Sequence, residues 1–180
     1  MKSFLRLGLM ILLIAAVSHM ITVWAYPYLI MTVVSDRVLK KAGVKVNMAI
    51  HSGLPTPERR TVVMPSPDLI YSFTAFDVSK TTLRITAPVP SGTYWSLAFY
   101  GSNTDNFYHI NDRQADTNPV DILLVGPNAS PPAANGAKVV IAPSRKGVIL
   151  ARFLVKDHTR LDDLVKIQKQ LSCKPIKELP

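Results

Sequence analysis

The sequence predicts a mainly β domain, built as an antiparallel β-sandwich or a barrel-like sheet, with one C-terminal helix and an N-terminal transmembrane helix before it. Two patterns carry this prediction. Residues Leu7 to Val34 include no formally charged side chain, and the chain after them alternates polar and apolar residues in short segments separated by proline and glycine. We therefore divide the chain into an anchor with a juxtamembrane helix, residues 1–45, and a single extracytoplasmic domain, residues 46–180.

The apolar run is interpreted as a membrane span. At about 1.5 Å per residue it is long enough to cross a hydrocarbon core about 30 Å thick. The alternative is a cleaved secretory signal, with Lys2 and Arg6 before an apolar segment and a small-residue cleavage site at Ala25. The apolar character continues past Ala25 as far as Val34, which favours an anchor.

Aromatic and basic residues mark where the span ends. Trp24, Tyr26 and Tyr28 suit the aromatic belt of the far membrane interface. Basic residues stand on both sides of the run, so the positive-inside rule does not decide the orientation, and those after it can also lie against anionic lipid headgroups. A first apolar segment this close to the N-terminus resembles a signal anchor. We therefore expect a single-pass protein with its domain outside the cytoplasm.

Composition limits the partners and the covalent chemistry. The net charge is +9, but the basic residues are scattered and form no stripe interleaved with aromatic residues, so no nucleic-acid partner is expected. Cys173 is the one cysteine, which rules out an internal disulfide. We expect its thiol to act as a small buried hydrophobic group.

About seven segments have the period-two pattern of half-buried strands. In Tyr94–Phe99, for example, Trp95, Leu97 and Phe99 share one side, and Pro88–Gly92 supplies the turn before it. Runs of strands without intervening helices favour an antiparallel arrangement. The expected strands are Leu69–Val78, Thr82–Ala87, Tyr94–Phe99, Phe107–Arg113, Val120–Val125, Lys138–Ile141 and Gly147–Val155.

One soluble helix is expected near the C-terminus. Thr159 to Asp162 resembles a capping box, and Pro175 marks the end. The helix should pack as a lid on the sheet through a stripe of apolar and neutral residues, which is more typical of core than of a cofactor site. The stripe consists of Leu161, Leu164, Val165, Gln168 and Leu171.

The candidate ligand or partner surface is the polar segment 103–113 with two aromatic neighbours. It concentrates amide, carboxylate, imidazole and guanidinium groups beside aromatic rings, a mixture suited to a polar ligand held against an aromatic wall. Its residues are Asn103, Asp105, Asn106, Tyr108, His109, Asn111, Asp112 and Arg113, with Tyr94 and Trp95.

A metal site or an acid/base pair at Asp105, His109 and Asp112 is the less favoured interpretation. In a regular strand Asp105 and His109 share a side, whereas Asp112 points to the other side, and no second histidine or cysteine lies nearby. The alternative is a turn rich in Asn and Asp, followed by an edge strand in which Arg113 pairs with Asp112 or Asp105. We expect no metal and no cofactor, and the sequence shows no phosphate loop, nucleophile elbow or zinc spacing.

A succession of motifs then points to a family. They are Pro67–Phe73, Phe76–Ser79, Leu83–Pro88, Gly92–Leu97, Asp105–Arg113, Leu124–Pro127 and Pro143–Arg152. Together they resemble the bacterial domain-of-unknown-function family 1254. The resemblance implies a mainly β domain, an N-terminal membrane segment in short members, and a frequent companion domain of family 1214. It brings no catalytic residues.

Two function classes remain open. Because the chain ends after the expected helix, the companion domain would have to come from another protein. The first class is a membrane-anchored module of the bacterial envelope that binds a partner protein or small ligand, located in the inner membrane with a periplasmic domain. The second is a subunit of an enzyme that the companion protein completes. The lack of a nucleophile with a nearby base favours the first class and leaves enzyme activity unsupported.

Overall fold

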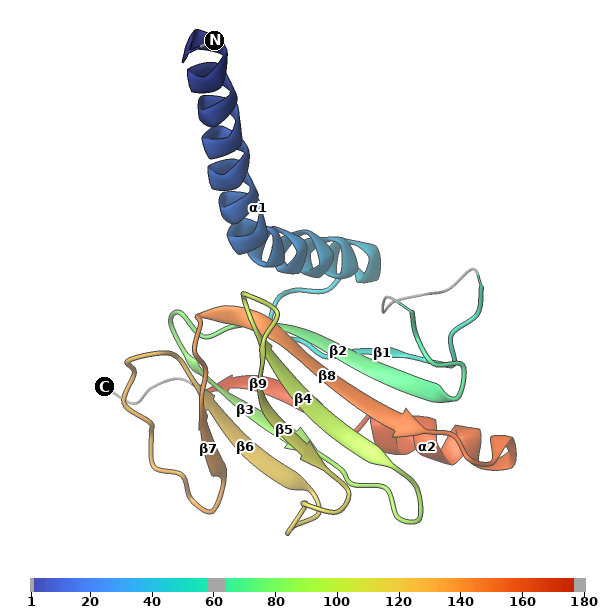
Figure 1. Cartoon of the computed structure of the whole chain (residues 1–180). Coiled ribbons are helices and arrows are strands. Elements are labelled where there is room, and N and C mark those ends of the chain that lie inside the picture. Colours follow the sequence, from blue (N-terminus) through green and yellow to red (C-terminus); the bar gives the residue numbers. More distant parts are fainter. Residues whose placement is uncertain (1, 58–63, 177–180) are drawn as a thin grey trace.

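The fold is a sandwich of two sheets below a long N-terminal helix (Figure 1). It is described by a computed structural model covering residues 2–57 and 64–176. One sheet has five strands in the order β1-β2-β8-β4-β5, and the other has four in the order β7-β6-β3-β9. The predicted mainly β domain with a C-terminal helix and an apolar N-terminal helix is thereby confirmed. The elements are α1 (Lys2–Ala42), β1 (Ile50–Ser52), β2 (Leu69–Asp77), β3 (Thr82–Ala87), β4 (Trp95–Gly101), β5 (Asn106–Asn111), β6 (Val120–Val125), β7 (Lys138–Ile141), β8 (Lys146–Leu154), α2 (Leu161–Gln168) and β9 (Ser172–Ile176).

The core lies between the sheets and follows the alternation seen in the sequence. The inward positions of β4 are Trp95, Leu97 and Phe99, and all three are fully buried. They belong to one apolar cluster with Leu83 of β3 and Ile122 of β6. Burying side chains of this size contributes roughly 1.5–3 kcal/mol each, which makes this cluster the main source of stability.

One strand pair departs from the antiparallel expectation. β7 pairs with β6 in parallel, with Val139 opposite Leu123. The chain reaches this register through residues 126–137, a connection long enough to return to the same end of the sheet. The four-stranded sheet is therefore mixed.

The C-terminal segment differs from the sequence prediction. The helix α2 ends at Gln168, and residues from Ser172 form β9, which pairs with β3. Pro175 lies on this edge strand. A residue without an N–H is tolerated there, because an edge strand forms backbone hydrogen bonds on one side only. The helix start also differs from the predicted capping box. Asp157 caps a short 3-10 turn (His158–Arg160), where its carboxylate accepts the Thr159 N–H at 2.9 Å. Helix α2 follows directly from this turn, and its own N-cap, Arg160, makes no side-chain cap bond.

Helix α2 closes the core beside β9, as its expected role of a lid implies. Leu164 and Leu171 are buried in the core cluster. The fully buried Gln168 donates from Nε2 to the carbonyls of Ser52 at 3.1 Å and Tyr71 at 2.8 Å. These bonds tie α2 to both strands of the β1–β2 pair, so the short strand β1 is held by side-chain bonding as well as by its ladder.

A pH dependence of stability is expected from His51 on β1. Burial, with the nearby positive charge of Lys169, lowers the pKa of its imidazole, and Nδ1 lies 2.9 Å from Ser72 Oγ. The folded state thus keeps the ring neutral, whereas the unfolded chain takes up a proton near pH 6.5. This stabilisation is present above that pH and is lost as the pH falls toward the lowered folded-state pKa.

Thermal unfolding between pH 7.5 and 5 tests this dependence. The parent protein should lose more melting temperature on acidification than His51→Asn, which retains a polar group toward Ser72 but cannot titrate. Equal losses in the two proteins would show that His51 does not contribute to the pH dependence.

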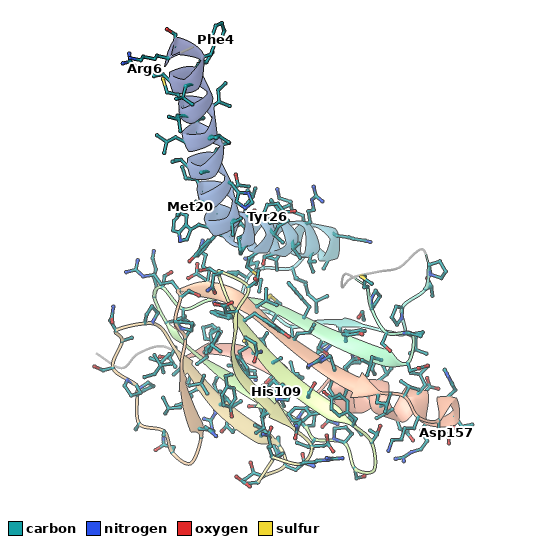
Figure 2. The ribbon with its side chains drawn as sticks, viewed as in Figure 1. Phe4, Arg6, Met20, Tyr26, His109 and Asp157 are labelled. Carbon is teal, nitrogen blue, oxygen red and sulfur yellow. The ribbon has the colours of Figure 1, made fainter. Side chains whose placement is uncertain are left out.

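Helix α1 has two parts that meet at a bend near Pro27. Figure 2 shows Tyr26 at the bend and Phe4 and Arg6 at the far end of the straight first part, whose side chains are exposed. Proline removes one helical hydrogen bond and clashes with the preceding turn, which accounts for the bend. Among the described residues, α1 is the one helix long and apolar enough to span a membrane.

The second part of α1 packs on the outer face of the five-stranded sheet. Met31, Val38 and Leu39 contact a cluster formed by Phe73, Ala75 and Val148. This contact explains why β2, expected to be half-buried, is buried on both faces. Helix α1 and the sandwich are thus joined by packing as well as by the chain.

The segment after α1 is fixed by Asn47. Its Nδ2 donates to the Asp77 carbonyl at 3.0 Å, its Oδ1 accepts the Asp77 N–H at 2.7 Å, and its own N–H donates to the Ala75 carbonyl at 2.8 Å. Asn47 has a φ of 68°, a left-handed conformation that asparagine tolerates better than most residues. We call these bonds the Asn47 clamp.

Candidate functional site

A polar cleft of about 930 Å³ opens at the end of the sandwich opposite α1. Two loops form most of it, the β3–β4 loop (88–94) and the β5–β6 loop (112–119) (Figure 1). Lys156, just after β8, completes the wall. The cleft exists because β3, β5 and β8 all end on this side of the sandwich. We call it the distal cleft.

Hydrogen bonds within and between the loops give the distal cleft a defined shape. Asn118 donates from Nδ2 to the carbonyl of Val89 and accepts its N–H at Oδ1, each at 2.9 Å. Thr93 Oγ1 donates to the Leu154 carbonyl at 2.6 Å. Because these side chains bond to backbone groups across the loops, they hold the walls in place and are not free to bind a ligand.

Asp112 and Asn111 are also occupied by backbone groups. The Asp112 carboxylate accepts the N–H of Trp95 at 3.4 Å, and the Asp112 N–H donates to the Trp95 carbonyl at 3.1 Å. Asn111 Oδ1 accepts the N–H of Arg113 at 3.0 Å, and the Asn111 carbonyl accepts two further turn N–H groups. The turn after β5 is therefore fixed by Asn and Asp side chains that bond to backbone groups.

Two charged side chains in the distal cleft have no such partner. Arg113 and Asp116 are exposed, and neither forms an ion pair or side-chain hydrogen bond within the described residues. The predicted pairing of Arg113 with Asp112 or Asp105 is not found there. Lys156 adds a second positive charge and bonds only weakly, from Nζ to the Gly92 carbonyl at 3.4 Å. The cleft thus offers unpaired groups of both signs.

The predicted site residues divide between the two ends of β5. Tyr94, Asn111, Asp112 and Arg113 line the distal cleft. Asn103, Asp105 and Asn106 lie at the other end, in and after the β4–β5 turn, where Asn103 Nδ2 donates to Asp105 and Asn106 Nδ2 donates to the Phe99 carbonyl at 3.1 Å. The structure does not bring these two groups together.

The remaining three candidates line neither end, since Tyr108 and His109 lie within β5 and Trp95 is buried next to Asp112. Tyr108 packs edge-on against Phe99, with ring centroids 5.4 Å apart, and Lys138 Nζ lies 5.4 Å from its ring centroid. His109 lies in mid-strand, over the middle of the sandwich in Figure 2. Trp95 is fully buried, and its indole N–H has no partner among the described residues.

The structure separates the acid and imidazole groups of the candidate metal or catalytic trio. Asp105 and Asp112 flank opposite ends of β5, roughly 20 Å apart at about 3.3 Å per residue. His109 lies between them on the strand. Within residues 2–57 and 64–176, no group of three His, Cys, Asp or Glu side chains is placed to hold a metal ion.

Sequence reasoning missed most of the distal cleft. Ser91, Asp116 and Lys156 line it but stand on three segments far apart in the chain. A signal was present, since Pro88–Gly92 and Asp116–Pro119 are both turn sequences that follow strands. Which turns meet depends on the order of strands in the two sheets, and the local pattern does not specify that order.

Comparisons with known proteins agree with this fold. Residues 46–175 match the family described as "Protein of unknown function (DUF1254)". The VPA0106 protein of Vibrio parahaemolyticus has a similar structure, with a TM-score of 0.65 at 13% identity over 87% of this chain and 37% of that chain. An uncharacterised protein of Burkholderia cenocepacia gives 0.50 at 18% identity over 87% of this chain and 42% of that one. No curated protein sequence matches. The chain therefore spans about two-fifths of the length of these solved relatives.

Proposed function

Because this chain belongs to the DUF1254 family of proteins of unknown function, its role has to be inferred from its own site, and we propose that it is a membrane-anchored binding module. In this proposal the distal cleft binds a polar small ligand or a polar segment of a partner protein. Helix α1 anchors the module in the bacterial inner membrane, and the sandwich lies in the periplasm.

The observation that carries the proposal is the pair of unpartnered charges in the distal cleft. The side chains of Thr93, Asp112 and Asn118 bond to backbone groups and fix the loops, whereas Arg113 and Asp116 are available. A preformed concave site with a few available polar groups is typical of ligand binding. Arg113 can pair with a carboxylate or phosphate through two parallel bonds, and Asp116 can accept from an amine or amide.

The support for anchoring is the exposed first part of α1. Its large apolar side chains, such as Leu12 at 67% and Leu13 at 65% exposed, contact nothing in the sandwich. Exposed apolar surface of this extent is costly in water and favourable in lipid. The domain follows a signal-anchor-like segment, which supports placement outside the cytoplasm.

The proposal predicts that Arg113→Ala loses binding without losing stability. A photo-reactive benzoylphenylalanine at Thr117, inside the cleft, should crosslink the occupant in intact membranes, and mass spectrometry then identifies it. Arg113→Ala should reduce this crosslink about tenfold, because a lost charge-assisted bond costs at least ~1.4 kcal/mol. Its melting temperature should stay within about 2 °C of the parent, as is usual for an exposed side chain.

Two controls accompany this experiment. The same crosslinker at Lys174, exposed on β9, should not yield the Arg113-dependent product. Asp112→Ala should lower the melting temperature, because it leaves the N–H of Trp95 without its carboxylate partner. A crosslink at Thr117 that Arg113→Ala leaves unchanged would contradict the proposed site.

A second candidate function is a subunit of an enzyme completed by a companion protein of family 1214. The observation that favours it is length, since the solved chains that resemble this one contain more than twice the matched portion. In this case the Thr117 crosslink should contain one protein in stoichiometric amount, and the two proteins together should show an activity that neither has alone. A small-molecule occupant, or a complex without activity, would contradict this second candidate.

A further inference from the structure

We propose that the end of the sandwich next to α1 is a docking surface for anionic phospholipid headgroups, so that the domain rests on the membrane and the distal cleft faces away from it. This inference rests on the proposed anchoring by α1. It adds a second, electrostatic membrane contact, made by turns of the β-sandwich.

Helix α1 changes direction where it meets the sandwich. After the bend at Pro27 the helix turns away from the axis of its first part and runs along the sandwich (Figure 1). One face of this second part covers the sheet through Met31, Val38 and Leu39. At 100° per residue, the opposite face carries Leu29 and Lys40, both exposed. Leu29 can therefore enter the boundary between headgroups and acyl chains, and Lys40 can lie against an anionic headgroup.

Three turns of the sandwich lie next to α1. The groove between α1 and the sheet is lined by Asp77, Ser102 and Lys146, which stand at the β2–β3, β4–β5 and β7–β8 turns. The turns are bonded together, since the Val78 N–H donates to the Arg145 carbonyl at 2.8 Å. They form one surface on the membrane side of the sandwich.

This surface carries a net positive charge. Its exposed basic residues on α1 and the turns outnumber the aspartates Asp36, Asp77 and Asp105 on the same end. Asp77 and Lys146 pair with each other at 3.7 Å, which leaves five basic residues against Asp36 and Asp105. Each Lys or Arg near an anionic surface contributes about 1 kcal/mol. The basic residues are Arg37, Lys40, Lys41, Lys80, Arg145 and Lys146.

An exposed apolar side chain, Ile141, lies beside these basic residues. Ile141, the last residue of β7, is 60% exposed and stands next to the turn that carries Arg145. Its neighbour along the turn, Pro143, is exposed as well. An exposed isoleucine near basic residues suits the boundary between headgroups and acyl chains. There the isoleucine can contact acyl chains while the basic side chains contact anionic headgroups.

A fluorescence experiment on the full chain in lipid nanodiscs tests the inference. The environment-sensitive dye NBD is attached at Ile141→Cys or, as a matched control in the distal cleft, at Thr117→Cys. Burial raises the pKa of the Cys173 thiol to about 12, so the native cysteine should react slowly, and the parent chain measures this background. The nanodiscs contain either phosphatidylcholine alone or an equal mixture with phosphatidylglycerol.

The dye at Ile141→Cys should be at least twofold brighter and blue-shifted in the anionic nanodiscs, and the dye at Thr117→Cys should be equal in both. Adding Lys80→Glu and Arg145→Glu should remove the difference at Ile141→Cys. Equal signals at Ile141→Cys in both lipids, from a chain that has inserted, would overturn the docking surface while leaving the anchor intact. A chain that fails to insert would instead overturn the anchoring proposal and this inference with it.

Discussion

Replacing Gly147 with alanine is expected to destabilise the sandwich by about 3 kcal/mol, the upper part of the range for overpacking a core. A Cβ at this position would lie 2.1 Å from the Tyr100 carbonyl oxygen and 2.6 Å from Cζ of Phe76. Gly147 is opposite Gly101 in the β4–β8 ladder, and Phe76 is 1% exposed in the core. Neither neighbour can move without breaking strand pairing or opening a cavity.

The measurement is thermal unfolding of the full chain in detergent, where a loss of this size corresponds to roughly 10 °C for a domain of this length. Gly53→Ala is the matched control, because nothing lies within 4 Å of its Cβ position and its φ is not positive. It should melt like the parent. A Gly147→Ala protein that melts as high as Gly53→Ala would show that the packing around β8 is looser than described.

The strands could be predicted because each buries alternate residues locally. In β4 the pattern Trp95, Leu97, Phe99 alone specifies a face, and the structure places that face in the core. In β2 the same pattern predicts only half of the burial. Phe73 and Ala75 share one face of a strand expected to be half-buried, and that face is covered by α1. Burial of that second face depends on a helix more than thirty positions away in the chain.

The C-terminal strand could not be predicted from its residues. Ser172–Ile176 is short, half-exposed and contains Pro175, so its local signals favour the end of a helix. It becomes a strand because the free edge of β3 offers hydrogen bonds there, with Cys173 opposite Ile85. The three-residue strand β1 is similar, since it depends on pairing with β2 and on the amide of Gln168.

Only part of the candidate site could be predicted from the sequence, for the same reason. Tyr94 and Arg113 are adjacent in space because β4 and β5 pair, and a hairpin is a short-range feature that the sequence specifies. Asp116 and Lys156 join them through the arrangement of both sheets, which is a long-range feature. The role of Asn106 was also unpredictable, because its bond to the Phe99 carbonyl fills a register shift between Phe99 and Tyr100.

Asn47→Ala is expected to have the second large effect, about 2–3 kcal/mol. It removes the two side-chain bonds of the Asn47 clamp to the backbone of Asp77, each contributing roughly 1 kcal/mol, and it puts a less tolerant residue at a φ of 68°. Asn47→Gly removes the same bonds without the left-handed penalty, so it should lose less stability than Asn47→Ala. Lys45→Ala, an exposed neighbour, should lose almost none.

Hydrogen exchange then shows whether the clamp joins α1 to the sandwich. The Asn47 bonds end on the backbone of β2 at Asp77, and Met31, Val38 and Leu39 pack close by on the outer face of the sheet, against the cluster that contains Phe73 and Ala75. If they act together, Asn47→Gly should speed exchange at the Asp77 amide and in residues 31–39, while β6 amides keep the parent rates. Faster exchange confined to Asp77 would mean that the helix is held by its apolar packing alone. Exchange that spreads along α1 would mean that the position of α1 on the sandwich depends on one asparagine, because a loosened second part of α1 leaves only the chain itself between the first part of α1 and the sandwich.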